Sequence, residues 1–216
     1  MKEIQFQDKQ FERAVLTQLD SSRERVTLED IQQIRGILIT HDDASEIYIP
    51  WYSDSWELDI PMRDDSRLPS DEDDYPWKVP MIRPNLRFNV NATNGLWEQD
   101  LRHFSHIETL YIYAPTEDLK FLGDFATNLQ ELYVVDSYTK NWSFIRNLIN
   151  LRLLFISTCD DGLDVNPICE LSKINNRLTH VGLEYKIYGP PLGNPLAEFI
   201  ELELNASFSN RSIREG

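Results

Sequence analysis

The sequence has few cysteines, no long apolar run and no apolar stretch at its start. Its two cysteines, Cys159 and Cys169, are too few for a disulfide framework, so we expect both thiols to be reduced. A run of about 18 apolar residues is absent, which excludes a transmembrane helix. The opening residues, MKEIQFQDKQ, carry acids where a signal peptide would be apolar. We therefore expect a cytoplasmic protein; the alternative is a secreted protein whose signal sequence lies upstream of Met1.

Basic residues are also scarce. Lysines and arginines number 21 against 36 acids, which gives a formal net charge of −15. This charge would repel nucleic acids and anionic membranes, so neither is expected as a partner. Between Asp42 and Asp74 there are twelve acidic and two basic residues, so one segment holds two thirds of the net charge. A basic protein or peptide is the expected partner, and the specific hypothesis is an immunity-like inhibitor.

A repeated pattern is the main feature that is present. Ile107, Leu129 and Leu151 are spaced by 22 residues, and each opens an L-x-x-L-x-L run. Leu178 and Phe199 open two further runs, at spacings of 27 and 21 residues. A fixed period of this length is typical of leucine-rich repeats, in which each turn has one strand and one return segment. Bulky apolar residues in the returns predict short helical or 3₁₀ turns there.

The N-terminal region predicts a helical cap. Residues 8–20 place apolar residues at helical spacing, with Asp8 as the N-cap. Thr27 and Asp30 resemble a capping box before a second short helix, and a strand is expected around residues 37–39. This order resembles the N-terminal caps of internalin-like bacterial leucine-rich-repeat proteins, and the later repeats resemble theirs. The resemblance implies a cap that shields the apolar end of the first repeat.

The predicted fold class is α/β, as a leucine-rich-repeat solenoid. A curved parallel β-sheet would form the concave face, and short helical or 3₁₀ returns would form the convex face. Residues 1–40 are predicted as the N-terminal helical cap and first strand. Residues 41–84 are predicted as an acidic, Trp- and Pro-rich insertion or degenerate repeat, and residues 85–216 as the repeats. The resemblance is specific for the fold and weak for the function, because fold does not fix function, and it does not imply the host-cell adhesion of internalins. We expect a protein-interaction module.

Side chains between the apolar positions of successive strands would form ladders on the concave face. We expect an aromatic ladder of Tyr111, Tyr133 and Phe155, with Tyr113 beside it. Exposed aromatic side chains aligned on one face are typical of binding hot spots. The alternative is that they stack across the strands for stability, worth roughly 0.2–1 kcal/mol per pair. Three polar residues on the same face are also predicted to bind the partner: Glu131, His180 and Glu184.

The acidic segment predicts a second partner-binding surface. Its candidate residues are tryptophans and acids: Trp51, Trp56, Asp71, Asp73 and Asp74. The acids would attract a basic partner, and the tryptophans would add apolar or cation–π contact. The alternative interpretation is a solvated loop that aids solubility. Extracellular adhesion or carbohydrate binding is the rival function, because aromatic and acidic side chains also serve those roles.

Signals for an enzyme or a metal site are weak. His103 and His106 are three residues apart, but no Cys or acid completes a zinc signature. The acids of residues 71–74 lack the spacing of an EF-hand loop. Cys159 has no histidine near it in sequence that would activate it as a nucleophile. We therefore predict a non-enzymatic protein with no catalytic residue, no metal site and no cofactor.

Overall fold

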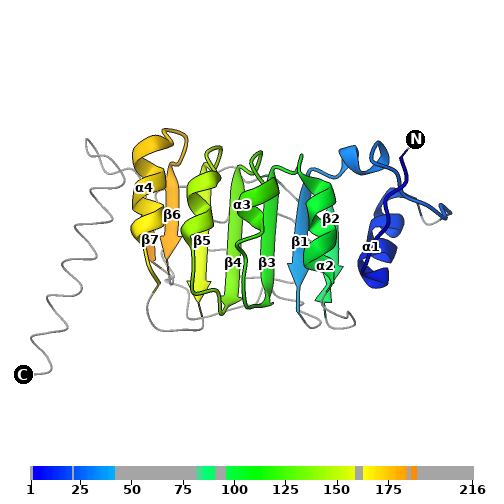
Figure 1. The fold of residues 1–216 in the computed structure, drawn as a ribbon, viewed down its shortest axis with the longest axis horizontal. Coiled ribbons are helices and arrows are strands. Elements are labelled where there is room, and N and C mark those ends of the chain that lie inside the picture. Colours follow the sequence, from blue (N-terminus) through cyan, green and yellow to red (C-terminus); the bar gives the residue numbers. More distant parts are fainter. Residues whose placement is uncertain are drawn as a thin grey trace, which may run out of the picture. The chain divides into compact units, whose positions relative to one another are not determined.

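The fold is known from a computed structural model, which describes residues 2–20, 22–41, 82, 84–90, 96–158, 163–183 and 186–188. These residues belong to two compact units, Met1–Ala114 and Pro115–Gly216, and each unit is described by itself. Both units are α/β, with parallel strands that alternate with short helical segments (Figure 1). Almost all of the predicted insertion, and the strand predicted from Phe199, lie outside the described residues.

Two capping signals set the local structure at the start of the first unit. Helix α1 (Lys9–Leu19) begins after Asp8, whose Oδ1 accepts the free backbone N–H groups of its first turn at 2.9 and 3.1 Å. The turn η1 (Asp30–Gln33) follows Thr27, whose N–H and hydroxyl both donate to Oδ2 of Asp30, at 2.8 and 2.7 Å. Both predicted caps are confirmed. The second helix is a single 3₁₀ turn.

Three parallel strands form the sheet of the first unit. They are β1 (Gly36–Thr40), β2 (Leu86–Asn89) and β3 (Thr109–Thr116), with β1 between the other two. Gly36 opens β1 at a place where the backbone is crowded. A Cβ added to Gly36 would lie 2.9 Å from Cα of Pro84, so this close approach requires glycine.

The return segment before β3 is helical, as the repeat pattern predicts. It consists of α2 (Trp97–Asp100) and η4 (Leu101–Phe104), and α2 lies across one face of the strands (Figure 1). His106 follows this return and lies with its Nε2 2.9 Å from the carbonyl oxygens of both Ile31 and Ile34. The ring thereby links the return to the cap, which gives His106 a role in the fold.

The second unit continues the alternation of strands and returns. Its strands are β4 (Glu131–Ser137), β5 (Leu153–Thr158), β6 (His180–Leu183) and β7 (Lys186–Tyr188). β4, β5 and β6 pair in parallel, and β7 pairs with β6 in the antiparallel sense, which the repeat pattern does not predict. Leu153 pairs with Glu131 on one side and with His180 on the other, so the predicted register is confirmed.

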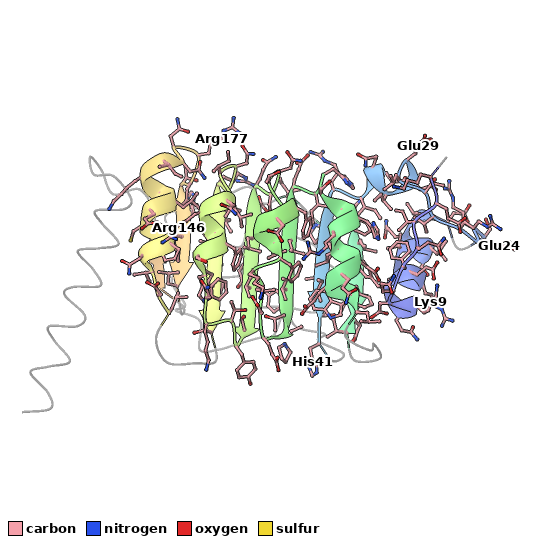
Figure 2. All side chains as sticks on the ribbon, in the orientation of Figure 1. Lys9, Glu24, Glu29, His41, Arg146 and Arg177 are labelled. Carbon is pink, nitrogen blue, oxygen red and sulfur yellow. The ribbon has the colours of Figure 1, made fainter. Side chains whose placement is uncertain are left out.

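The returns of the second unit are short and lie on one face of its strands (Figure 1). They are α3 (Leu122–Phe125), η5 (Ser143–Asn147) and α4 (Asn166–Ile174), which confirms the predicted helical and 3₁₀ turns. Charged side chains such as Arg146 and Arg177 project outward from this unit (Figure 2). None of the described helices is long and apolar enough to cross a bilayer.

Candidate functional site

The aromatic ladder is buried. Tyr111 and Tyr133 are 0% exposed, and Phe155 is 1% exposed. In the second unit the rings of Tyr133 and Phe155 stack, with centroids 4.3 Å apart and planes inclined by 10°. The prediction of an exposed aromatic surface is therefore wrong, and stacking across the strands describes this pair correctly.

Burial on both faces of the strands is the physical reason for this correction. Every residue from Leu153 to Ser157 in β5 is buried, whichever face of the sheet its side chain occupies. Parallel sheets that are covered on both faces have nearly continuous apolar strands, whereas one-sided sheets alternate. The runs LYVV and LLFI are of the continuous type. The L-x-x-L-x-L pattern shows which residues share a face, but it does not show which face meets water.

Glu131 and His180, also predicted on the concave face, belong to a charge cluster within the second unit. Glu131 is fully buried and forms an ion pair with Arg152, whose side chain is 27% exposed. His180 is half-buried, and its Nδ1 lies 2.8 Å from Oγ1 of Thr179. Burial and the nearby Arg152 cation lower the pKa of His180, which favours the neutral imidazole. The Glu131 carboxylate is thus buried in an ion pair within the second unit. The prediction that Glu131 contacts a partner is therefore wrong.

The other predicted residues divide into one that is partly exposed and several that the structure does not describe. Tyr113 lies in β3, in register with Thr40, and keeps partial exposure. The remaining candidates fall outside the described residues: Trp51, Trp56, Asp71, Asp73, Asp74 and Glu184. Within the described part of the chain, no three His, Cys, Asp or Glu side chains are grouped closely enough to hold a metal ion.

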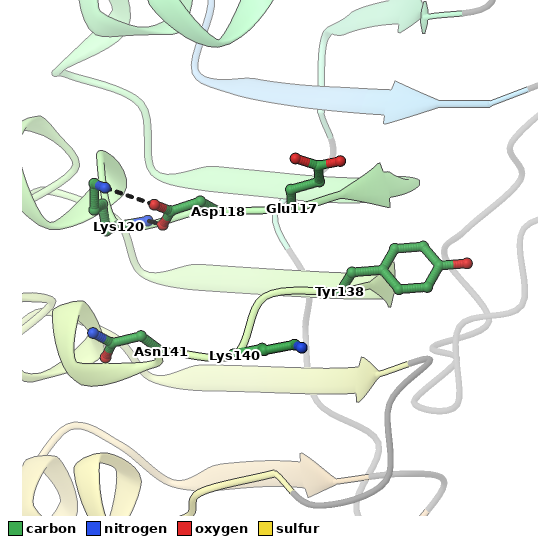
Figure 3. A pocket seen from close by; sticks show the side chains of 6 residues that line it. All are labelled: Glu117, Asp118, Lys120, Tyr138, Lys140 and Asn141. Atoms are coloured by element: carbon green, nitrogen blue, oxygen red, sulfur yellow. Dashed lines mark hydrogen bonds and ion pairs between the residues drawn. The ribbon is translucent and has the colours of Figure 1, made fainter.

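An exposed group of side chains in the second unit follows Thr116 and Ser137, the last residues of β3 and β4. We name it the strand-end rim, and its members line a cavity of about 680 Å³ in the second unit: Glu117, Asp118, Lys120, Tyr138, Lys140 and Asn141 (Figure 3). Open α/β sheets commonly place their ligands at the carboxyl ends of parallel strands. Tyr138 is 46% exposed, and no other aromatic side chain that the structure describes is as open to solvent. The strand-end rim is therefore the candidate site.

Buried hydroxyl groups fix the backbone beneath the strand-end rim. Ser137 Oγ accepts hydrogen bonds from Oγ1 of Thr116 at 3.0 Å and from the N–H of Thr139 at 3.1 Å. The same hydroxyl donates to the carbonyl of Thr116 at 3.3 Å, so its donor and both acceptor positions are used. The N–H of Tyr138 donates to that carbonyl at 2.8 Å. The buried residues Thr116, Ser137 and Thr139 directly precede three exposed rim residues: Glu117, Tyr138 and Lys140. Hydrogen bonds therefore hold the backbone from which these exposed side chains extend.

The charges of the strand-end rim are partly paired. Lys120 places its Nζ 2.8 Å from Oδ2 of Asp118, and its backbone N–H donates to Oδ1 at 2.9 Å. The hydrogen bond from Lys120 holds the pKa of Asp118 below its ordinary value, so this carboxylate is ionised and neutralised locally. Glu117 and Lys140 form no ion pair with any described residue. The Tyr138 ring points away from both of these side chains (Figure 3).

Comparison with known proteins finds similarity among solved structures. No family model and no curated protein matches the sequence. Among solved structures, an internalin (InlF) from Listeria monocytogenes is similar, with 14% sequence identity and a TM-score of 0.44. The similarity covers 87% of this chain and 46% of the internalin, so this chain spans less than half the length of that protein. The function has to be inferred from this chain's own residues.

The strand-end rim has no signature in the sequence that marks it as one site. Its residues follow the strands in the peptides TEDLK and SYTKN, which share no spacing pattern. Glu117 and Tyr138 are 21 residues apart, and only the pairing of the backbones at Thr116 and Tyr138 brings them together. A weaker signal is present after β3 and β4, where a hydroxyl residue precedes a charged or aromatic residue: Thr116-Glu117 and Ser137-Tyr138. Asn141, the last rim residue, also serves the fold by accepting the N–H of Ser143 at 3.0 Å.

Proposed function

We propose that the chain is a leucine-rich-repeat solenoid that binds a protein partner and does not catalyse a reaction. The repeat is supported by β3, β4 and β5, which begin 22 residues apart at Thr109, Glu131 and Leu153. β4 and β5 pair with equivalent positions in register, and a short helical segment precedes each of them. Stacked repeats of this kind offer an extended surface to a partner.

The observation that carries the binding proposal is the 46% exposure of Tyr138 on a hydrogen-bonded scaffold. Tyrosine combines a large apolar ring with a polar end, and it is enriched among the residues that contribute most to binding. A side chain that starts from a fixed backbone loses less conformational freedom when a partner binds. The charged neighbours Glu117 and Lys140 supply the polar surroundings that usually enclose an interface anchor.

Charge favours a basic partner. The whole chain has a net charge of −15, whereas the described residues hold 17 acids and 15 basic residues and are nearly balanced. The electrostatic attraction of a basic partner therefore comes mainly from the acidic residues outside the described part of the sequence. This attraction acts over a long range. Such a field speeds encounter with an oppositely charged partner more than it strengthens the final contact. The specific proposal is an immunity-like inhibitor of a basic protein in the cytoplasm.

A peptide-display selection on the full chain would supply defined probes for this function. We expect the selected peptides to bind the wild type in the micromolar range or better, and Tyr138→Ala to weaken the affinity by about tenfold, or about 1.4 kcal/mol. Ile174→Ala is the matched control, because Ile174 is an apolar side chain with 69% exposure away from the strand-end rim. Isothermal titration calorimetry measures both variants.

Three results would decide the proposal. Equal affinity of wild type and Tyr138→Ala for every selected peptide would show that the strand-end rim is not the contact. Binding of glycans, with no peptide selected, would support the rival carbohydrate function instead. Weaker association as the ionic strength rises toward about 0.15 M would support the contribution of charge, because salt screens exposed charges.

A further inference from the structure

Two buried carboxylates meet where the N-terminal segment, residues 2–8, contacts the return formed by α2 and η4. Asp8, which precedes α1, is 1% exposed, and Asp100, the last residue of α2, is 0% exposed. The backbone N–H of Asp8 donates to Oδ2 of Asp100 at 2.7 Å. We propose that Asp8 and Asp100 form a proton-binding site, at which one proton from solvent tightens the hold of the N-terminal segment on this return.

Asp100 attaches the N-terminal segment to the return. Its Oδ1 accepts the N–H of Gln7 at 2.8 Å, and its Oδ2 accepts the N–H of Asp8. These bonds join residues that are 93 and 92 positions apart in the sequence. The ring of Phe6, only 5% exposed, packs edge-on against Phe11 beside them. The charge state of Asp100 therefore acts directly on the contact between the cap and the first unit's sheet.

Asp8 contributes an oxygen without a donor. Its Oδ1 accepts the N–H groups of Gln10 and Phe11 and so caps α1. Its Oδ2 is buried and has no hydrogen-bond partner within the described part of the chain. Buried polar atoms are almost always hydrogen-bonded. A protonated carboxyl group carries an O–H donor, so one proton on the pair supplies a donor that two carboxylates lack.

The cations near this pair do not neutralise it. Neither carboxylate forms an ion pair with a described residue, although Lys9 and His103 attract Asp100 at longer range. The Lys9 side chain is 75% exposed, and its Nζ lies 2.8 Å from Oε2 of Glu12. The His103 ring packs edge-on against Phe6, with centroids 5.8 Å apart. Two buried like charges without a bound cation favour uptake of a proton.

The direction of the pH effect follows from these surroundings. Burial raises the pKa of Asp100, and the charge of Asp8 acts in the same direction, against the N–H bonds and His103. The folded state therefore binds the proton more tightly than the unfolded chain, in which an aspartate has a pKa of about 3.9. The stabilisation is complete below that value and is lost as the pH rises through the folded pKa. At pH 7 the charged pair therefore costs stability.

The substitution Asp8→Asn imitates the bound proton. Asparagine and aspartate are equally good N-caps, so the amide oxygen can cap α1 while the amide N–H₂ takes the place of Oδ2. We expect the thermal midpoint of the full chain at pH 7 to rise by about 2–4 °C. The difference from the wild type should shrink as the pH falls toward about 4. Because two proteins are compared, the titration of other groups cancels.

Asp164→Asn is the matched control. Asp164 is exposed, and its Oδ1 accepts the N–H of Asn166 at the start of α4, as Oδ1 of Asp8 accepts the N–H of Gln10. No rise in the thermal midpoint is expected for this variant. A rise of equal size would show that the gain comes from a better cap and would overturn the proposal. A midpoint of Asp8→Asn at or below that of the wild type at pH 7 would overturn it too.

An NMR titration of the ¹⁵N-labelled full chain reads the site directly. The amide groups of Gln7 and Asp8 donate to Asp100, so their signals report its ionisation. We expect both signals to titrate with a midpoint above about 3.9, and Asp8→Asn to lower the midpoint of the Gln7 signal. A wild-type midpoint at or below about 3.9 would contradict the proposal. Neither measurement involves a partner, so both outcomes leave the proposed function unaffected.

Discussion

The aromatic ladder and the strand-end rim contain the same kinds of residue in opposite surroundings. In the second unit, Tyr133 is fully buried and stacked on Phe155, and its neighbour Glu131 is a buried acid paired with Arg152. In the strand-end rim, Tyr138 is 46% exposed, and its neighbour Glu117 pairs with no described cation. Burial, and not residue type, separates the tyrosine inside the fold from the tyrosine whose side chain is open to solvent.

The largest predicted effect separates the two tyrosines by stability. Tyr133→Ala removes a fully buried ring whose centroid lies 4.3 Å from that of Phe155. It should lower the free energy of unfolding by about 3–5 kcal/mol, a large share of the ~5–15 kcal/mol of a typical domain. Tyr138→Ala should change it by less than about 0.5 kcal/mol, because the side chain is exposed. Urea denaturation followed by circular dichroism compares the two, and similar stabilities would contradict the assignment of roles.

The second prediction compares the two glutamates. Glu131→Gln leaves Arg152 without its buried ionic partner. We expect a loss of about 2 kcal/mol in unfolding free energy, less than for a fully buried pair because the Arg152 side chain keeps 27% exposure. Glu117→Gln in the strand-end rim is the control and should leave stability unchanged within about 0.5 kcal/mol. A Glu131→Gln variant as stable as the wild type would show that the buried pair contributes no net stability.

The smallest prediction concerns pH and the charge cluster beside the aromatic ladder. The pKa of His180 is lowered by burial and by the Arg152 cation, so the folded state favours the neutral ring. Its contribution to stability is present above the unfolded pKa of about 6.5 and is lost as the pH falls below that value. We expect the thermal midpoint to fall with decreasing pH in this window, and His180→Gln to flatten that fall. A steeper fall in the variant would contradict the sign of the shift.

Local sequence signals predicted much of the fold correctly. The N-cap at Asp8 and the capping box of Thr27 and Asp30 depend on side chains that bond to backbone groups two or three residues away. Such signals are complete within a short peptide. The register of β4 and β5 was also predictable, because equal spacing of apolar positions aligns equivalent residues.

Exposure and the candidate site were not predictable in the same way. The buried ring of Tyr133 stacks on Phe155, which lies 22 residues further along the chain. The strand-end rim depends on the hydrogen bond between Thr116 and Tyr138, which exists only after the strands have paired. The antiparallel strand β7 is three residues long and carries too little pattern to be recognised. Non-local contacts account for the first two misses, and the short length of β7 accounts for the third.

The central claim is that a partner contacts the strand-end rim and not the aromatic ladder. Amide chemical-shift mapping of the full chain with one display-selected peptide tests it without any substitution. We predict that the largest shifts cluster at residues 116–118 and 137–141. Shifts concentrated at Glu131, Tyr133 and Phe155, with the rim amides unmoved, would contradict the claim.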